Sequence, residues 1–496
     1  MRSTLRGFFA LLLAELLVFA PLWAHRKEPP VKSLPPVVFQ PFAETIQKPY
    51  LTLFRIAPTL EFTQAQIDSM RAYLNQAEDY CVGQFKARAR QYEAQLRSDQ
   101  QKLHGLKVEA DRHALHCDIQ NARAGALRAR LLAGQAIPTA YQNRLAKLEL
   151  IQNWPGQVRV IRQELADGSY RNRRWGNVQD IGFREIAAGQ QDDIKAGQEA
   201  IRQMKQDGLM PKEYENQAVT DYVNSVAQKV AAHSDLHVPL HVTVLNTKEI
   251  NAFALPGGYL FVDRGLLEAV DDESELAGVM GHEIGHDVAR HSHKLMKRAT
   301  VESLFYQAAQ VAGIVLTGGI ASIGAYYALQ YGFEGLGLLL NLNLLGVSRE
   351  YELQADQLGT QYAWNSGYDP SGFIRFFDKM ATKEGYVNGL SWFYDHPPFY
   401  QRMVDAEKEI LFLPKKPNLA VNTTAFMKMK DDLKRAAVTA QKKESNGDAP
   451  SLLAPEPGCG APPAITFPGQ QIEAICAVTP KQLEVKRSTL KDRTKP

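Results

Sequence analysis

Residues 282–286 read His282, Glu283, Ile284, Gly285 and His286, a His-Glu-x-x-His motif. Four-residue spacing places both imidazoles on one face of a helix, one turn apart, where each can offer a nitrogen to a single metal ion. The glutamate between them can reach a water bound to that metal. This pattern is typical of zinc hydrolases, but so short a string also arises by chance, so its surroundings must decide.

The surroundings of the motif carry helix signals. Asp271, Asp272 and Glu275 supply an N-cap and an approximate capping box. Apolar residues follow at helical spacing, at positions 276, 279, 280, 284 and 288. The motif is therefore predicted to lie on a helix.

Glu352 is the best candidate for a third metal ligand. Residues 348–356 (Ser-Arg-Glu-Tyr-Glu-Leu-Gln-Ala-Asp) contain no proline or glycine and predict a second helix, on which Glu352 and Asp356 share a face. One carboxylate can bind the metal while the other braces a histidine, because metal-bound imidazoles usually donate their second N–H to such a group. From the residues alone, a solvated pair of surface charges is the commoner interpretation.

Four ordered motifs resemble one known family. They are residues 251–267, beginning Asn-Ala-Phe-Ala-Leu-Pro-Gly-Gly, then 275–286, then 348–356, and finally Asp-His-Pro-Pro at 395–398 with Arg402. The chain resembles, over roughly residues 180 to 412, the zinc metallopeptidase family that holds the heat-shock protease HtpX, the BepA-like periplasmic proteases and the C-a-a-X prenyl protease. The resemblance implies an α+β, zincin-like fold, mainly helical with a small sheet.

The resemblance also implies roles for individual residues. The two histidines and the downstream glutamate bind zinc in that family, which assigns the metal to His282, His286 and Glu352. Glu283 would be the general base, and Asp356 would orient a ligating imidazole.

Two further residues are expected to act on the reacting carbonyl. Three protein ligands leave a fourth position for water, whose pKa zinc lowers towards about 7. His396 resembles a family histidine that lies near the metal, where it stabilises the transition state or closes the open position in a latent enzyme. His396 or Arg402 could stabilise the oxyanion. From the residues alone, a histidine before two prolines is more often a loop residue.

A strand is expected beside the metal. Residues 241–245 alternate like a strand, and a Pro-Gly-Gly turn follows at 256–258. The resemblance suggests that Asn251 and Ala252 belong to an edge strand to which a substrate peptide adds by backbone hydrogen bonds. A plain hairpin with a glycine-rich turn fits the same residues.

The ends of the chain predict an exported protein with distinct segments. Arg2, Arg6 and the apolar run 7–24 read as a signal peptide, with an uncleaved anchor as the alternative. The predicted organisation is a signal peptide at 1–24, a Pro-rich linker at 25–62, a helical hairpin region at 63–150, a zinc metallopeptidase domain at 151–412 and a partly disordered extension at 413–496 containing a helix at 424–443.

The four cysteines are expected to form two local disulfides, Cys81 to Cys117 and Cys459 to Cys476, as suits an oxidising compartment. The first bridge would place the hairpin turn near Ser98 and Asp99. One long helix whose cysteines do not meet is the alternative, and a zinc site made of these cysteines is less favoured because close Cys-x-x-Cys pairs are absent.

The uncharged stretch 303–333 is long enough to span a bilayer. Its glutamines, glycines and position between two halves of the predicted zinc site favour packing within the enzyme. Contact with a membrane surface is the alternative.

Composition favours a globular protein without a nucleic-acid partner. The chain has 496 residues, 57 basic and 54 acidic, and a net charge of +3. The predicted function is a zinc-dependent endopeptidase acting on polypeptides, with quality control of misfolded envelope proteins implied by the resemblance. A zinc-binding chaperone or interaction protein with latent or absent protease activity is the alternative, and a nonpeptidase metallohydrolase would need a closed pocket. The expected location is the periplasm or another exported compartment, at a membrane face or free of it, and the oligomeric state stays open.

Overall fold

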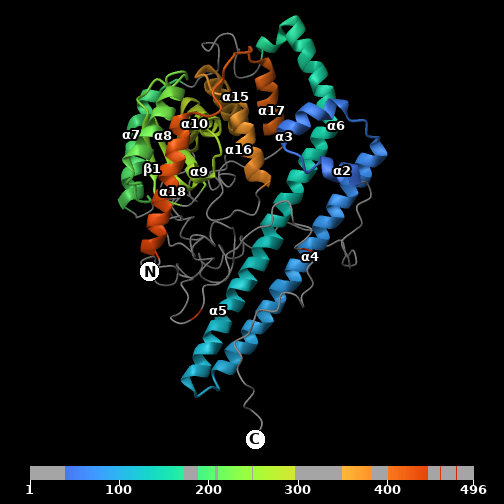
Figure 1. The fold of residues 1–496 in the computed structure, drawn as a ribbon, viewed down its shortest axis with the longest axis vertical. Coiled ribbons are helices and arrows are strands. Elements are labelled where there is room, and N and C mark those ends of the chain that lie inside the picture. Colours follow the sequence, from blue (N-terminus) through green and yellow to red (C-terminus); the bar gives the residue numbers. More distant parts are fainter. Residues whose placement is uncertain are drawn as a thin grey trace, which may run out of the picture.

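The computed structural model describes residues 40–172, 188–206, 210–247, 250–296, 349–382 and 400–444, together with Cys459 and Cys476. Helices dominate this part of the chain and surround one small sheet (Figure 1). The predicted α+β class, mainly helical with a small sheet, is confirmed. The predicted signal peptide and the 303–333 stretch lie outside the described residues.

The sheet has three strands, β1 (His241–Leu245), β2 (Ala252–Leu255) and β3 (Tyr259–Asp263), in the order β1-β3-β2. Strand β3 is central and pairs parallel with β1 and antiparallel with β2. Gly257 and Gly258 form the β2–β3 turn with φ of 90° and 88°, a conformation that favours glycine. Within the described residues no strand pairs with the outer side of β2.

The His-Glu-x-x-His helix lies at the centre of the molecule. Helix α10 (Glu273–Val288) is buried along its whole length and packs against α15 (Arg349–Asn365) and α16 (Ser371–Thr382). Its N-terminus has the predicted signals, since the Asp272 carboxylate accepts from the Glu275 backbone N–H and Glu275 accepts from the Asp271 N–H. The capping prediction is therefore confirmed.

Other helices enclose this centre. They are α7 (Gln190–Gln206), α8 (Gln217–Ala231), α9 (Arg264–Ala269), α11 (His291–Met296), α17 (Tyr400–Phe412) and α18 (Thr424–Glu444). Helix α8 packs against α10, β1 and α18, and α17 packs against α15. The helix predicted at 424–443 is α18, which ends one residue later.

A long helical hairpin extends away from the enclosed helix α10 (Figure 1). Helix α4 (Gln64–Leu103) runs beside α5 (Glu109–Leu131), which continues through a short π-helical segment at Leu132–Ala136 into α6 (Ile137–Asp167). The hairpin is present, but its turn lies after Leu103 and not near Ser98 and Asp99. Asp99 stays helical because it is buried and accepts a hydrogen bond from Gln95, one turn earlier.

Two predicted boundaries differ from the structure. The boundary at residues 150–151 falls inside α6, which continues through Pro155 and Gly156. The segment predicted as a linker contains α2 (Gln40–Thr45), α3 (Tyr50–Ile56) and a 3₁₀ turn at Ala57–Thr59. These helices form because their apolar side chains join the core.

Contacts at the base of the hairpin fix it to the rest of the protein. Trp154 Nε1 of α6 donates to the Phe54 carbonyl at 2.9 Å. The Asp378 carboxylate of α16 accepts from the Tyr50 backbone N–H at 2.9 Å and lies 3.2 Å from the Lys147 ammonium of α6. The hairpin base, α3 and α16 therefore share one core.

The predicted disulfide pairing is wrong. Cys81 bonds to Cys476, and Cys117 bonds to Cys459. Cys81 lies 22 residues before the end of α4, whereas Cys117 lies 8 residues after α5 begins. At 1.5 Å per residue the two sites are about 20 Å apart along the hairpin axis, so they cannot meet. Both bonds instead join the hairpin to the C-terminal extension.

Candidate metal centre

Three buried side chains converge at the centre of the molecule. Nε2 of His282 and Nε2 of His286 lie 2.9 Å apart. The Glu352 carboxylate lies 3.6 Å from Nε2 of His282 and 3.4 Å from Nε2 of His286. Ligand atoms around a tetrahedral zinc, at bonds of about 2.0–2.2 Å, are separated by about 3.3–3.6 Å. The two distances to Glu352 match this separation, and the two Nε2 atoms would need to move apart by only about 0.4 Å. The donor set and its spacing therefore fit the zinc site that the sequence predicts.

A close crossing of two helices brings Glu352 to the histidines. A Cβ at Gly359 of α15 would lie 2.6 Å from the backbone nitrogen of His282, and one at Gly281 would lie 2.8 Å from the Gly359 carbonyl oxygen. Neither contact leaves room for a side chain. The two glycines therefore allow α15 to approach α10 closely enough for Glu352 to reach both imidazoles.

Asp356 lies one turn beyond Glu352 and holds the other side of His282. Its Oδ1 is 2.8 Å from Nδ1 of His282. This arrangement fixes the imidazole so that Nε2 faces the metal position. Burial raises the pKa of Asp356, and the adjacent Arg402 opposes that shift.

Arg402 contacts two carboxylates of the site. Its Nε and Nη2 each donate to the Asp356 carboxylate at 2.7 Å, and its Nη1 lies 3.0 Å from Oε2 of Glu352. The side chain is fully buried. Its guanidinium nitrogens face the carboxylates behind the metal position, and the contact with substrate or an oxyanion that the sequence suggested stays a prediction.

His286 has a partner that sequence analysis missed. Nδ1 of His291 lies 2.9 Å from Nδ1 of His286, and Nε2 of His291 lies 3.0 Å from Oε1 of Gln354. Burial lowers the pKa of His291 well below its usual value, so the ring is neutral. The sequence feature that could have identified this partner is a third histidine, five residues after His286.

Asp287, another residue that sequence analysis missed, connects α10 to the sheet. Its carboxylate accepts from the backbone N–H groups of Gly257 at 3.1 Å and Gly258 at 2.7 Å. Burial raises its pKa to about 7. This contact fixes the β2–β3 turn against the helix that carries the histidines.

The remaining predicted site residues have these positions. Glu283 is buried in the same turn of α10 as His282 and His286. Asn251 and Ala252 are buried at the start of β2, and the Asn251 side chain accepts from the Ala252 N–H at 3.0 Å. Strand β2 packs against α10. His396 lies outside the described residues.

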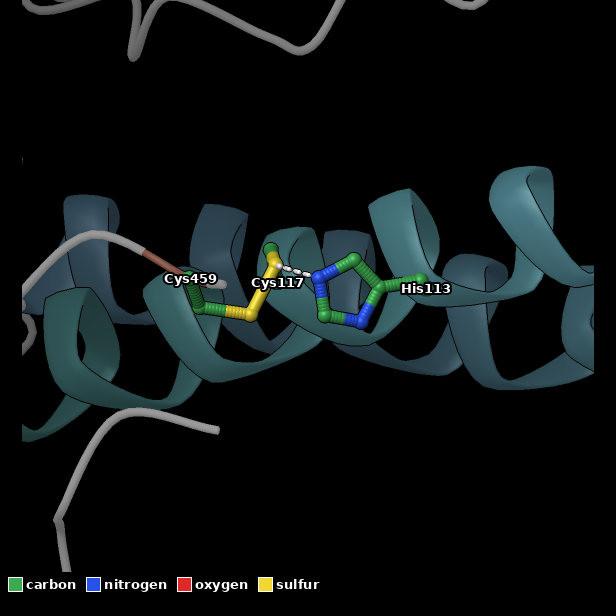
Figure 2. Close-up of side chains that lie close together, drawn as sticks. All are labelled: His113, Cys117 and Cys459. Carbon is green, nitrogen blue, oxygen red and sulfur yellow. Dashed lines mark hydrogen bonds between the residues drawn. A yellow bond between two sulfur atoms is a disulfide. The ribbon is translucent and has the colours of Figure 1, made fainter. Parts of the chain in front are cut away.

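A second cluster of metal-ligand residue types lies on the hairpin. Figure 2 shows His113 beside the Cys117–Cys459 disulfide, with Nε2 of His113 3.9 Å from Sγ of Cys117. Both sulfurs are consumed by the disulfide, so neither is available as a thiolate. The buried His282, His286 and Glu352 cluster is therefore the metal site that this structure supports.

The fold and this buried donor set define a metallopeptidase-type centre. Residues 216–410 match the profile described as Peptidase family M48. This match covers the part of the chain that carries the candidate metal centre, and it confirms the resemblance found in the sequence.

Curated relatives share the same part of the chain. The β-barrel assembly-enhancing protease of Yersinia pestis is 28% identical over 218 residues, which is 43% of each chain. Its Escherichia coli K12 counterpart is 29% identical over 198 residues, covering 39% of this chain and 38% of that protein. The mitochondrial metalloendopeptidase OMA1 of Schizosaccharomyces pombe is 31% identical over 194 residues, covering 38% and 52%. The chain thus spans about half or less of the length of these relatives.

Proposed function

We propose that this protein is a zinc-dependent endopeptidase. The observation that carries the proposal is the convergence of His282, His286 and Glu352 around one point, with Glu283 in the same buried turn. Zinc bound there would lower the pKa of a water to near neutrality and polarise the scissile carbonyl.

The protein's own groups would handle the protons. Glu283 takes a proton from the attacking water and returns it to the leaving amine. Asp356 keeps the Nδ1 proton of His282 in place, so that Nε2 remains a metal ligand. Arg402 balances the charge of Asp356 and Glu352, which would otherwise repel each other in a buried site. His396 remains the proposed donor to the oxyanion or the residue that keeps the enzyme latent.

Polypeptides are the proposed substrates. Strand β2 is an edge of the described sheet and packs beside the metal helix, where an extended peptide could add by backbone hydrogen bonds. Asn251 and Ala252 are the residues proposed to contact it. Both residues are buried, so a peptide would reach them only after the groups that cover them move aside.

Envelope proteins are the proposed substrate class, and quality control is the proposed role. The relatives are named for β-barrel assembly and for a mitochondrial endopeptidase. The signal-like N-terminus and the paired cysteines support export. No helix among the described residues is long and apolar enough to cross a membrane.

The proposal is tested by measuring zinc content and casein cleavage for the parent protein and Glu283→Gln. Both proteins are expected to bind one zinc per chain, and the variant should lose cleavage by at least about 100-fold, because general-base catalysis contributes 10²–10⁴. Glu199→Gln, an exposed change on α7, is the matched control and should cleave normally. A parent protein that binds zinc and does not cleave casein would overturn the assignment of the unmodified protein as an active peptidase. Cleavage by His396→Ala would then show that His396 keeps the enzyme latent.

The long α4–α5 hairpin favours a second candidate function, a zinc-binding chaperone or interaction protein. A 40-residue helix that extends from the enclosed centre is suited to holding a partner. Suppression of aggregation that survives Glu283→Gln unchanged would support this candidate.

A further inference from the structure

His291 occupies the side of His286 that faces away from Glu352. The ring begins α11, is 1% exposed, and stacks on Tyr351 of α15 with centroids 4.3 Å apart and planes 10° apart. Its Nδ1 lies 2.9 Å from Nδ1 of His286, and its Nε2 lies 3.0 Å from Oε1 of Gln354. Both ring nitrogens therefore have defined neighbours.

The positions of the protons follow from these contacts. A contact of 2.9 Å between two Nδ1 atoms needs one proton, carried by one of the two rings. If Nε2 of His286 binds a metal, its Nδ1 carries the proton and donates it. Nδ1 of His291 is then the acceptor, and the proton of His291 sits on Nε2, where Oε1 of Gln354 accepts it. Each N–H group along this chain of hydrogen bonds then has an acceptor.

We infer that His291 is a positioning residue for the metal centre: it accepts the Nδ1 proton of His286 and, anchored by Gln354, fixes that imidazole as an Nε2 ligand. The inference rests on the proposed function, and it extends that function to a residue outside the ligand set.

The two histidine ligands are thus held in different ways by one helix. His282 faces the Asp356 carboxylate, whereas His286 faces a neutral imidazole anchored by Gln354. Asp356 and Gln354 both lie on α15 with Glu352. Because a carboxylate is a stronger acceptor than an imidazole, the metal bond of His286 receives the weaker support.

The test is the zinc dissociation constant, measured by competition with a chromophoric chelator on the full-length protein. His291→Phe keeps the ring volume and the stack on Tyr351 but removes the acceptor. It should weaken zinc binding about 10–100-fold, the usual effect of removing an outer-shell partner. His237→Phe, an exposed histidine before β1, is the matched control and should leave the constant unchanged.

Two variants of Gln354 separate positioning from packing. Gln354→Glu retains an acceptor for Nε2 of His291 and should bind zinc within a few-fold of the parent protein. Gln354→Leu keeps similar bulk without an acceptor and should weaken binding in the same direction as His291→Phe. The unfolding temperature of each metal-free variant is measured alongside, because a purely structural role would lower it and leave zinc affinity unchanged.

The outcomes distinguish this inference from the proposed function. Equal zinc affinity in the parent, His291→Phe and Gln354→Leu proteins would overturn the role of His291 and leave the metal site intact. A parent protein that binds no zinc would overturn the proposed function itself. Weaker binding in both variants with an unchanged metal-free unfolding temperature is the result expected.

Discussion

Arg402 Nη1 lies 3.0 Å from Oε2 of Glu352, so a buried guanidinium contacts a proposed metal ligand from behind. The same side chain holds Asp356 through two further hydrogen bonds of 2.7 Å. One residue of α17 thus connects the ligand glutamate with the carboxylate that supports His282.

Replacing Arg402 should damage stability and metal binding together. Arg402→Met retains the length of the side chain and leaves two buried carboxylates without their cation, which typically costs about 3–5 kcal/mol. Urea unfolding of the metal-free variant measures this cost. An exposed arginine of the hairpin, changed in Arg130→Met, serves as the control, since its ion pair with Glu93 lies at the surface. Equal stability of Arg402→Met and the parent would contradict the buried network.

Asp356→Asn tests the support of His282. Its amide preserves the volume but removes the charge, so zinc affinity should fall about 10–100-fold. Chelator competition measures the change. A variant that binds zinc as tightly as the parent would show that Asp356 does not orient the ligand.

The close crossing of α10 and α15 predicts that glycine-to-alanine changes at two positions affect stability very differently. Gly359→Ala should destabilise the protein by about 1–3 kcal/mol, because its Cβ meets the backbone of His282, and it should also weaken zinc binding. Gly83→Ala in α4, where nothing lies within 4 Å of the added atom, should be neutral or stabilising by about 1 kcal/mol. Denaturant midpoints of the two variants check the prediction, and a neutral Gly359→Ala would refute the close crossing.

Glu407 of α17 predicts a pH-dependent stability. Burial raises its pKa from 4.5 to about 7, with Asp369 adding to the shift. Between these values the folded protein holds a proton that the unfolded chain releases, so this group's contribution to stability falls as pH rises from about 4.5 to 7. Glu407→Gln removes that loss. Its stability relative to the parent should therefore be greater at pH 8 than at pH 5, as read from urea midpoints, and an identical difference at both pH values would contradict the shift.

The disulfides predict a specific peptide map. Proteolysis without reductant should yield peptides joining Cys81 to Cys476 and Cys117 to Cys459. Mass spectrometry identifies them, and a peptide joining Cys81 to Cys117 would refute this pairing. Cys117→Ser with Cys459→Ser should lower stability by about 2–5 kcal/mol, since the bond closes a loop of 342 residues.

The sequence predicted what depends on local spacing. Helical periodicity and capping residues located α10 and placed His282 and His286 on one face. The downstream glutamate could be assigned through a resemblance, and the structure brings Glu352 to the same point.

Features that depend on long-range packing could not be predicted in the same way. Arg402 and His291 reach the site only because α17 packs on α15 and α11 packs on α10, and no local sequence pattern predicts those contacts. The prediction of the disulfide pairing was wrong for a related reason. It relied on nearness in sequence, whereas Cys81 and Cys117 lie far apart along two antiparallel helices.

The pairing of early cysteines with late ones has a consequence during synthesis. The partners are separated by 395 and 342 residues. At roughly 5–20 residues per second, each hairpin thiol emerges about 20 to 80 seconds before the cysteine it must join. For that interval Cys81 and Cys117 have only each other and foreign thiols as partners. Correct oxidation of this chain is therefore a matter of timing as well as of geometry.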